Sequence, residues 1–378
     1  MKTGLYIHWP FCLSKCPYCD FNSHVRDRVD QTVWRDALLR ELDTMAARFG
    51  PPRIDTVFFG GGTPSLMPVA TAAALIERAG SLFGFSDDVE ITLEANPTSV
   101  EADALAGFRD AGVDRVSMGV QSLNPTALKF LGRQHSVDEA LAAVDVAAGL
   151  FDRFSFDLIY TLPNQTVDEW QDELGRALDF VKQRGGDHLS LYQLTIEPGT
   201  AFQTAERTGK LTLPEDDTAA NLFEATQAMM RDAGYPAYEI SNHAAAGGEC
   251  RHNLIYWRGE DYLGIGPGAH ARVTVDGVRQ ALRAERSPEK YLRRVQAEGH
   301  GLVEDAALSD EDTALERIMM GLRLTEGVPS GLLQATDAIA TRTTDLIGEG
   351  YLHKDAGRTR TTEAGRLRLN ALLGYLLA

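Results

Sequence analysis

Three cysteines near the beginning of the chain, Cys12, Cys16 and Cys19, have the residue type and spacing of a metal-binding loop. They are three of the chain's four cysteines, and gaps of four and then three positions let one tight loop turn all three thiolates inward. Thiolates are preferred ligands of soft metals and of iron–sulfur clusters. In a [4Fe–4S] cubane, three local cysteines leave one iron without a protein thiolate, so this iron can bind a small molecule.

Zinc is the main alternative for such a loop. Structural zinc takes four ligands, and His8 and His24 flank the cysteines. Zinc ribbons, however, have two short cysteine pairs separated by a longer gap, and the chain has no second pair. The spacing therefore favours a cluster over zinc, with reduced thiols that bind no metal as a third reading.

The elements that must position this loop alternate between strand and helix patterns. Residues 33–46 have the apolar spacing of an amphipathic helix, and the β-rich run 54–59 ends in Gly60-Gly61-Gly62-Thr63. Further helices are expected at 71–83, 100–111, 136–149, 167–182 and 214–232, and further strands at 89–93, 115–118, 154–160, 188–195 and 237–241. At least five βα units without a hairpin signal predict a parallel α/β sheet curled into a full or partial barrel.

Polar residues follow several of these strands. Glu94, Gln121 and Asp157 lie at or near strand ends, which form the active-site mouth in such barrels. Carboxylates suit an ammonium group, Gln and Asp suit hydroxyls, and Arg133 can hold a carboxylate with a forked pair of hydrogen bonds. The bare backbone of the glycine run can also let the polar groups of a ligand approach closely.

Composition restricts the class of protein. A length of 378 residues allows two or three domains, and 37 basic against 54 acidic residues give a formal charge of −17. A negative charge of this size repels nucleic acids and anionic membranes, which disfavours both as partners. The first residues have no apolar targeting segment, and no run approaches the roughly 20 apolar residues of a spanning helix. We therefore expect a cytoplasmic protein, in a reducing compartment that suits free thiolates.

The cysteine loop resembles that of a known family. Residues 6–12 (YIHWPFC) and 16–21 (CPYCDF) resemble the cluster loop of radical S-adenosylmethionine (SAM) enzymes, in the branch related to oxygen-independent coproporphyrinogen III oxidase. The resemblance implies a radical SAM barrel with a [4Fe–4S] cluster on Cys12, Cys16 and Cys19, whose open iron is chelated by SAM. It implies that SAM is contacted by Tyr6, Tyr18, Gly61, Gly62, Thr63, Glu94, Gln121, Arg133 and Asp157.

The resemblance extends over nearly the whole chain and predicts three parts. Residues 1–235 form the core barrel, and residues 236–304 connect it to a C-terminal domain. Within the connection, residues 261–270 are expected to make a tight chain reversal under the barrel mouth. Residues 305–378 look like a helical, winged-helix-like domain ending in one helix from Glu363. Basic residues cluster near its wing, yet acidic residues outnumber them, so we expect a packing domain and no nucleic-acid binding.

Two kinds of function occur in this branch: the oxidase, which decarboxylates propionates by radical chemistry, and heme chaperones, which bind heme for delivery. The oxidases carry an additional cysteine where this chain has Phe21, and a longer arm where only residues 1–5 precede Tyr6. His252-Asn253 and Tyr256-Trp257 match the HNxxYW motif associated with heme binding in the chaperones. We therefore predict a heme chaperone, with the oxidase as the alternative.

The predicted partners are heme, as cargo, and heme-accepting proteins, respiratory ones among them, which connects the protein to porphyrin metabolism. His252 is the candidate heme ligand, since imidazole commonly binds heme iron and the adjacent aromatic residues can cover the macrocycle. Cys250 is a rival ligand through its thiolate, and a hydrogen-bonded structural role is the third reading for His252. The sequence leaves open whether the chain forms a homodimer and whether SAM is cleaved.

Overall fold

A single curved sheet organises the molecule. The computed structural model describes residues 2–50 and 53–378. Its main sheet has 11 strands in the order β13-β12-β11-β10-β1-β4-β5-β6-β7-β8-β9. The parallel strands are β1 (Thr3–Trp9), β4 (Ile54–Gly61), β5 (Phe85–Ala95), β6 (Arg115–Gln121), β7 (Arg153–Tyr160), β8 (His188–Gln193) and β10 (Asp261–Ile265). Within the described residues the outermost strands do not pair with each other, so the sheet forms a partial barrel.

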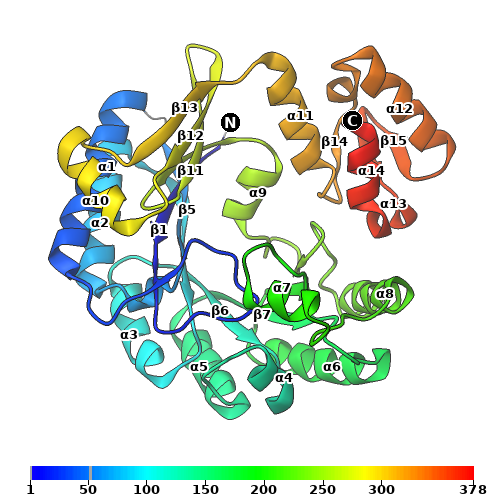
Figure 1. The fold of residues 1–378 in the computed structure, drawn as a ribbon, viewed down its shortest axis with the longest axis horizontal. Helices are drawn as coiled ribbons and strands as arrows, with labels where there is room; N and C mark the ends of the chain where they lie inside the picture. Colours follow the sequence, from blue (N-terminus) through cyan, green and yellow to red (C-terminus); the bar gives the residue numbers. More distant parts are fainter. Residues whose placement is uncertain (1, 51–52) are drawn as a thin grey trace.

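The crossovers between these strands are helical, as the alternating pattern predicts. The long helices are α1 (Gln31–Phe49), α2 (Val69–Phe83), α3 (Ser99–Asp110), α5 (Val137–Leu150), α6 (Val167–Gln183) and α8 (Asp216–Asp232). Shorter ones are η1 (Pro64–Leu66), α4 (Pro125–Phe130) and α7 (Ala201–Arg207). Figure 1 shows the long helices on the outer side of the sheet. Two of these helices begin with a capping box, in which two side chains each bond to the other residue's backbone N–H. The pairs are Ser136 with Glu139 at α5 and Thr166 with Glu169 at α6.

The central strand β1 is not among the strands expected from the sequence. Its second half belongs to the motif at residues 6–12, which the sequence analysis assigns to the cysteine loop. It lies between β10 and β4, and six of its seven residues are buried. Its Leu5 and Ile7 side chains have no exposed surface. The cysteine loop is therefore tied at its base to the middle of the sheet.

The expected strand at 237–241 is wrong. Only Ala237 makes a bridge, to His243, and the strand in this region is β9 (Asn242–Ala244), antiparallel to β8. The Glu239 carboxylate accepts hydrogen bonds from the backbone N–H of Ser241 and the side chain of Asn242. These bonds form a tight turn, which prevents residues 237–241 from running as a strand.

The segment 236–304 adds strands to the main sheet besides joining two parts of the chain. It contains β9, α9 (Arg251–Trp257), β10, β11 (His270–Val275), β12 (Val278–Ala284), α10 (Pro288–Glu298) and the first residues of β13 (Leu302–Ala307). The expected reversal at 261–270 includes the whole of β10, and only 266–269 form its turn. Buried Glu41 of α1 accepts hydrogen bonds from the backbone N–H groups of Gly266 and Gly301, which fixes this segment against the core.

The C-terminal elements form a second, smaller body (orange to red in Figure 1). They are α11 (Asp310–Gly321), β14 (Val328–Pro329), η2 (Ser330–Gln334), α12 (Asp337–Gly348), β15 (Leu352–Asp355), β16 (Arg358–Thr361), α13 (Glu363–Leu367) and α14 (Leu369–Leu376). The three strands pair in the order β14-β16-β15, and the helices enclose a separate core that includes Ile318 and Leu373. The expected single last helix is two helices, which meet at Arg368.

Candidate functional site

The cysteine loop closes over the carboxyl ends of the barrel strands. It is anchored by two short parallel strands, β2 (Phe11–Cys12) and β3 (His24–Val25), and the Lys15 ammonium group donates to the Ser23 carbonyl 3.3 Å away. All three thiols are partly exposed and line one cavity of about 540 Å³. Burial raises the pKa of the Cys12 and Cys19 thiols. Ionised sulfur at these positions therefore needs a stabilising positive group, such as a metal.

The same cavity collects most of the side chains predicted from the sequence. Besides the cysteines, the predicted residues that line it are Tyr18, Gly62, Thr63, Glu94, Gln121, Arg133 and Asp157. Tyr6 and Gly61 instead line a neighbouring pocket, which shares Glu94 with this one. Strand ends far apart in sequence thus converge as expected of a barrel. Gln121 does so with a left-handed backbone, φ 74°, at the end of β6.

A hydrogen-bond chain joins two of the cysteines through a residue that the sequence analysis missed. Thr63 Oγ1 donates to Cys12 Sγ at 3.4 Å, and Asn96 Nδ2 donates to Thr63 Oγ1 at 3.1 Å. Arg133 donates to Asn96 Oδ1 at 2.6 Å and to Cys16 Sγ at 3.3 Å. Asn96 stands two residues after Glu94, just beyond the end of β5. Its position after a strand end was the available signal.

Two partly buried carboxyl groups give the cavity its electrostatic character. Burial, reinforced by nearby Asp157, raises the pKa of Glu94 to about 8, and burial raises the pKa of Asp157 to about 6. Glu94 accepts a hydrogen bond from the Gly61 backbone N–H at 3.3 Å, and Asp157 accepts one from Ser117 Oγ at 3.4 Å. Two carboxyl groups whose pKa values are raised by partial burial favour a cationic ligand, because a cation stabilises their ionised forms.

The glycine run serves the packing of the protein itself. A Cβ on Gly60 would lie 2.9 Å from the Tyr6 ring, and one on Gly61 would lie 2.5 Å from the ring of His8. A Cβ on Gly62 would lie 2.7 Å from the carbonyl oxygen of Phe11. The missing side chains therefore let β4 fit closely against β1 and the base of the cysteine loop, and only Gly62 and Thr63 reach the cavity that holds the thiols.

The thiols suit a cluster better than a single ion. Within residues 2–50 and 53–378, no three His, Cys, Asp or Glu side chains converge as a single metal ion requires. A cubane distributes its ligands over different irons, so its cysteines need not meet at one point. The loop has three partly exposed thiols beside a polar cavity, and this donor set fits a [4Fe–4S] cluster with SAM beside it.

The heme-ligand candidates of the sequence analysis lie in the core. His252, on α9, has no exposed surface; its Nδ1 pairs with Thr56 Oγ1 and its Nε2 with Tyr256 Oη, both at 2.7 Å. Burial lowers its pKa to about 3, so the ring is neutral. Cys250 is 1% exposed, and its thiol donates to Glu90 at 3.7 Å. This arrangement matches the structural reading of His252, and heme ligation by either residue stays a prediction.

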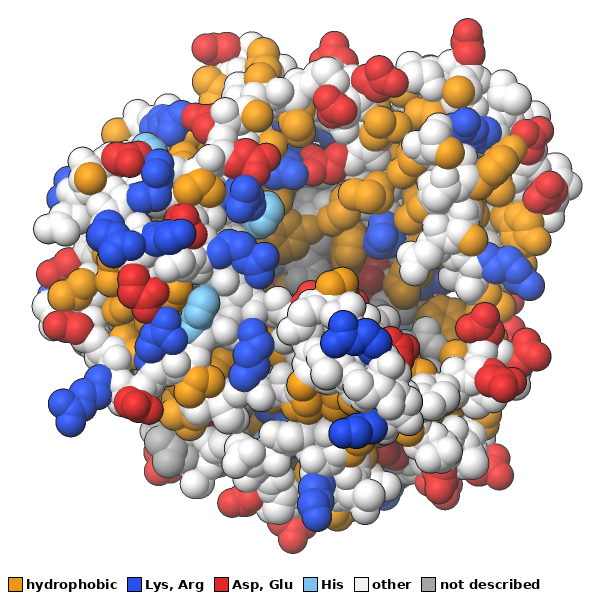
Figure 2. Space-filling model, in the orientation of Figure 1, with side chains coloured by type: hydrophobic (Ala, Val, Ile, Leu, Met, Phe, Trp, Pro, Cys, Tyr) orange, Lys and Arg blue, Asp and Glu red, His pale blue; other side chains and the backbone are white. Residues whose placement is uncertain are grey.

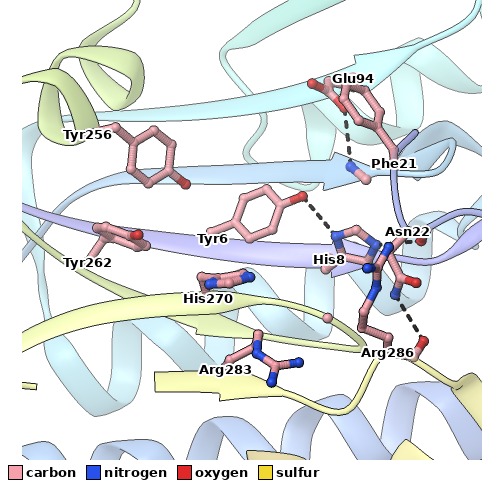
Figure 3. Close-up of a pocket in the computed structure, with 12 residues that line it drawn as sticks. Tyr6, His8, Phe21, Asn22, Glu94, Tyr256, Tyr262, His270, Arg283 and Arg286 are labelled. Carbon is pink, nitrogen blue, oxygen red and sulfur yellow. Dashed lines mark hydrogen bonds between the residues drawn. The ribbon is translucent and has the colours of Figure 1, made fainter. Parts of the chain in front are cut away.

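A second pocket, of about 660 Å³, adjoins the first on the other side of Glu94. Tyr6, Tyr256 and Tyr262 line it together with His270 and two arginines, Arg283 and Arg286. Figure 3 shows the tyrosine rings along one part of the pocket and the arginines along another. Figure 2 shows a hollow on this face of the molecule, with hydrophobic side chains on its wall and basic side chains beside it.

Comparisons with known proteins agree with this geometry. Residues 6–177 match the Radical SAM superfamily, and residues 308–368 match the HemN C-terminal domain. The heme chaperone HemW of Escherichia coli is 39% identical over 99% of this chain and 98% of its own. The mitochondrial radical S-adenosyl methionine domain-containing protein 1 of Mus musculus is 38% identical over 100% of this chain and 87% of its own.

Among solved structures, coproporphyrinogen III oxidase (HemN) of Escherichia coli shares the fold, with a TM-score of 0.81 at 24% identity over 99% of this chain and 90% of that one. The fold and the cysteine loop are those of a radical SAM protein. The chain belongs to the family of that class that contains the heme chaperone HemW. None of the helices in the described ranges is long and apolar enough to cross a membrane.

Proposed function

We propose that this protein is a heme chaperone, which binds heme and transfers it to acceptor proteins while it carries a [4Fe–4S] cluster and SAM. Similarity over nearly the full length to proteins named heme chaperone HemW is the observation that carries the proposal. We further propose that it acts in the cytoplasm and that respiratory proteins are among its acceptors.

The cluster and SAM have matching sites in this proposal. Cys12, Cys16 and Cys19 would hold the cluster, and the cavity beside them would hold SAM. Glu94 and Asp157 suit the methionyl ammonium group and the ribose hydroxyls, and Arg133 suits the methionyl carboxylate. When bound, these groups supply one-electron chemistry, and the residues of the chain bind and orient them.

The oxidase is the competing function, and a direct assay separates the two. Protein prepared without oxygen is titrated with heme, mixed with an apo-heme protein as acceptor, and separately incubated with SAM, a reductant and coproporphyrinogen III. We expect saturable heme uptake, transfer faster than from free heme, and no loss of carboxyl groups from the porphyrinogen. Decarboxylation by the unmodified protein, or no saturable heme uptake, would contradict the proposal.

A further inference from the structure

The pocket on the far side of Glu94 contains the chemical groups that heme needs. Heme is a flat apolar ring system with an iron that takes an axial nitrogen, and with two carboxylates on one edge. A binding site therefore needs aromatic walls, an accessible imidazole and cationic side chains together on one side. A volume of about 660 Å³ lies within the range of sites for ligands of this size.

The aromatic wall comes from three elements. Tyr6 stands on β1, Tyr262 on the adjacent β10 and Tyr256 on α9. The Tyr256 and Tyr262 rings meet edge to face, with centroids 4.6 Å apart. Phe21 of the cysteine loop also lines the pocket and is 60% exposed. An exposed phenyl ring and partly exposed tyrosine rings in the same pocket offer apolar surface that a macrocycle can cover.

The polar side of the pocket comes from the β11–β12 hairpin. His270 and Arg283 are directly paired across the two strands, and Arg286 follows the end of β12. Arg283 has a half-exposed partner, Glu304, at 2.9 Å, whereas Arg286 has no ion pair among the described residues. The two guanidinium groups in the lining of this pocket match two carboxylates.

Two histidines line the pocket, and only one of them can bind iron there. His8 is buried and uses both ring nitrogens, Nδ1 with Tyr6 Oη and Nε2 with the Asn22 carbonyl, each at 2.9 Å. His270 is exposed, and neither of its ring nitrogens is hydrogen-bonded to another of the residues that the structure describes. Although part of the ring is open to solvent, the desolvation of the rest and the charges of Arg272 and Arg283 lower the pKa of His270, which favours the neutral imidazole that ligates metals.

We propose that this pocket is the heme site, with His270 as an axial ligand of the iron and with Arg283 and Arg286 as partners of the propionates. The assignment rests on the proposed heme-chaperone function. It also gives the HNxxYW motif a role: His252 holds the Tyr256 hydroxyl and so positions one aromatic wall, as a positioning residue that does not touch the iron.

The first test is a titration of the full-length protein with ferric heme, followed by absorption spectroscopy. His270→Ala should lose the imidazole-type Soret band of the unmodified protein and bind heme at least about tenfold more weakly. Free imidazole should restore the band. His252→Ala should keep the band while its heme affinity falls. The exposed His353→Ala on β15 is the matched control and should behave as the unmodified protein.

The second test addresses the propionates with heme and with heme dimethyl ester, whose carboxylates are blocked. The double variant Arg283→Ala/Arg286→Ala should bind heme about tenfold more weakly and the ester as well as the unmodified protein does. Arg360→Ala, an exposed arginine on β16, is the control. An equal loss of affinity for both compounds would overturn the assignment of these arginines to the carboxylates.

The outcomes separate the site from the function. Saturable heme binding by the unmodified protein, with spectrum and affinity unchanged in His270→Ala, overturns the proposed ligand while the chaperone function stands. A loss of the Soret band in His252→Ala that imidazole restores, with His270→Ala unaffected, returns the ligand to α9. No saturable heme uptake by the unmodified protein overturns the function and the site together.

Discussion

The two cysteine- and histidine-containing motifs of this chain differ in where the fold places them. The cysteine loop opens into a cavity, and its thiols are partly exposed beside polar strand ends. In the HNxxYW motif His252 faces inward, and both of its ring nitrogens are bonded within the protein. A motif can thus contain a side chain that serves the core, as His252 does, beside one that faces a pocket, as Tyr256 does.

The largest expected effect is the loss of the iron–sulfur cluster from variants of the cysteine loop, with Cys250, the fourth cysteine, as the control. Replacement of Cys12, Cys16 and Cys19 together by Ala should abolish retention of iron and sulfide after anaerobic reconstitution. Cys250→Ala should retain both, because Cys250 is buried, bonds to Glu90 and does not line the cavity of the other three thiols. Iron and sulfide analysis decides the matter. Equal retention in the triple variant, or tight zinc in place of iron, would remove the cluster from this loop.

The next prediction concerns how much the HNxxYW motif contributes to the stability of the fold. His252→Ala leaves the buried Thr56 hydroxyl without its partner and opens a cavity, so the free energy of unfolding should fall by roughly 3 kcal/mol. Tyr256→Phe removes one hydrogen bond and keeps the ring, so about 1 kcal/mol is expected. Urea denaturation measures both values. An unchanged midpoint in His252→Ala would show that this histidine does not stabilise the core.

The sequence could predict the cavity because each strand end is a local pattern. Glu94 and Gln121 lie at or just beyond the ends of expected strands and Asp157 lies within one, and parallel strands bring their carboxyl ends together. Local patterns do not reveal which side of a helix faces the core, so the burial of His252 could not be read from its motif. The antiparallel pairing of β11 with β12, which brings His270 next to Arg283, is by contrast a local hairpin closed by Asp276-Gly277, both with positive φ. The Asp-Gly pair was a signal in the sequence that the sequence analysis missed.

Arg133 tests whether the cavity binds a carboxylate. The side chain donates to Asn96, to the Gly119 carbonyl and to Cys16, so its guanidinium group is already oriented into the cavity. Arg133→Ala should weaken SAM binding by about 1.5 to 3 kcal/mol, because it removes a charge-assisted hydrogen bond. Lys129→Ala, an exposed cation on α4, should have no effect. Calorimetry that finds equal SAM affinity in both variants would exclude Arg133 from the SAM site.

The last effect is a dependence of stability on pH that comes from Glu94, the carboxyl group that lines both the cavity and the aromatic pocket. Because burial raises the pKa of Glu94 from 4.5 to about 8, the folded protein holds a proton that the unfolded chain releases between these values. The contribution of this group to stability is full below pH 4.5 and is lost as pH rises toward 8, by at most about 1.4 kcal/mol per pH unit for one proton.

Glu94→Gln should therefore flatten the pH dependence of the free energy of unfolding between pH 5 and 8, measured in parallel with the unmodified protein in the same cluster state. The cationic ammonium group of SAM should favour the ionised carboxylate, so SAM binding below pH 8 should release protons, and the variant should release fewer. Calorimetry in buffers of different ionisation enthalpy measures this release. An equal proton release by the two proteins would place the ammonium group away from Glu94, and would leave the raised pKa as a property of burial alone.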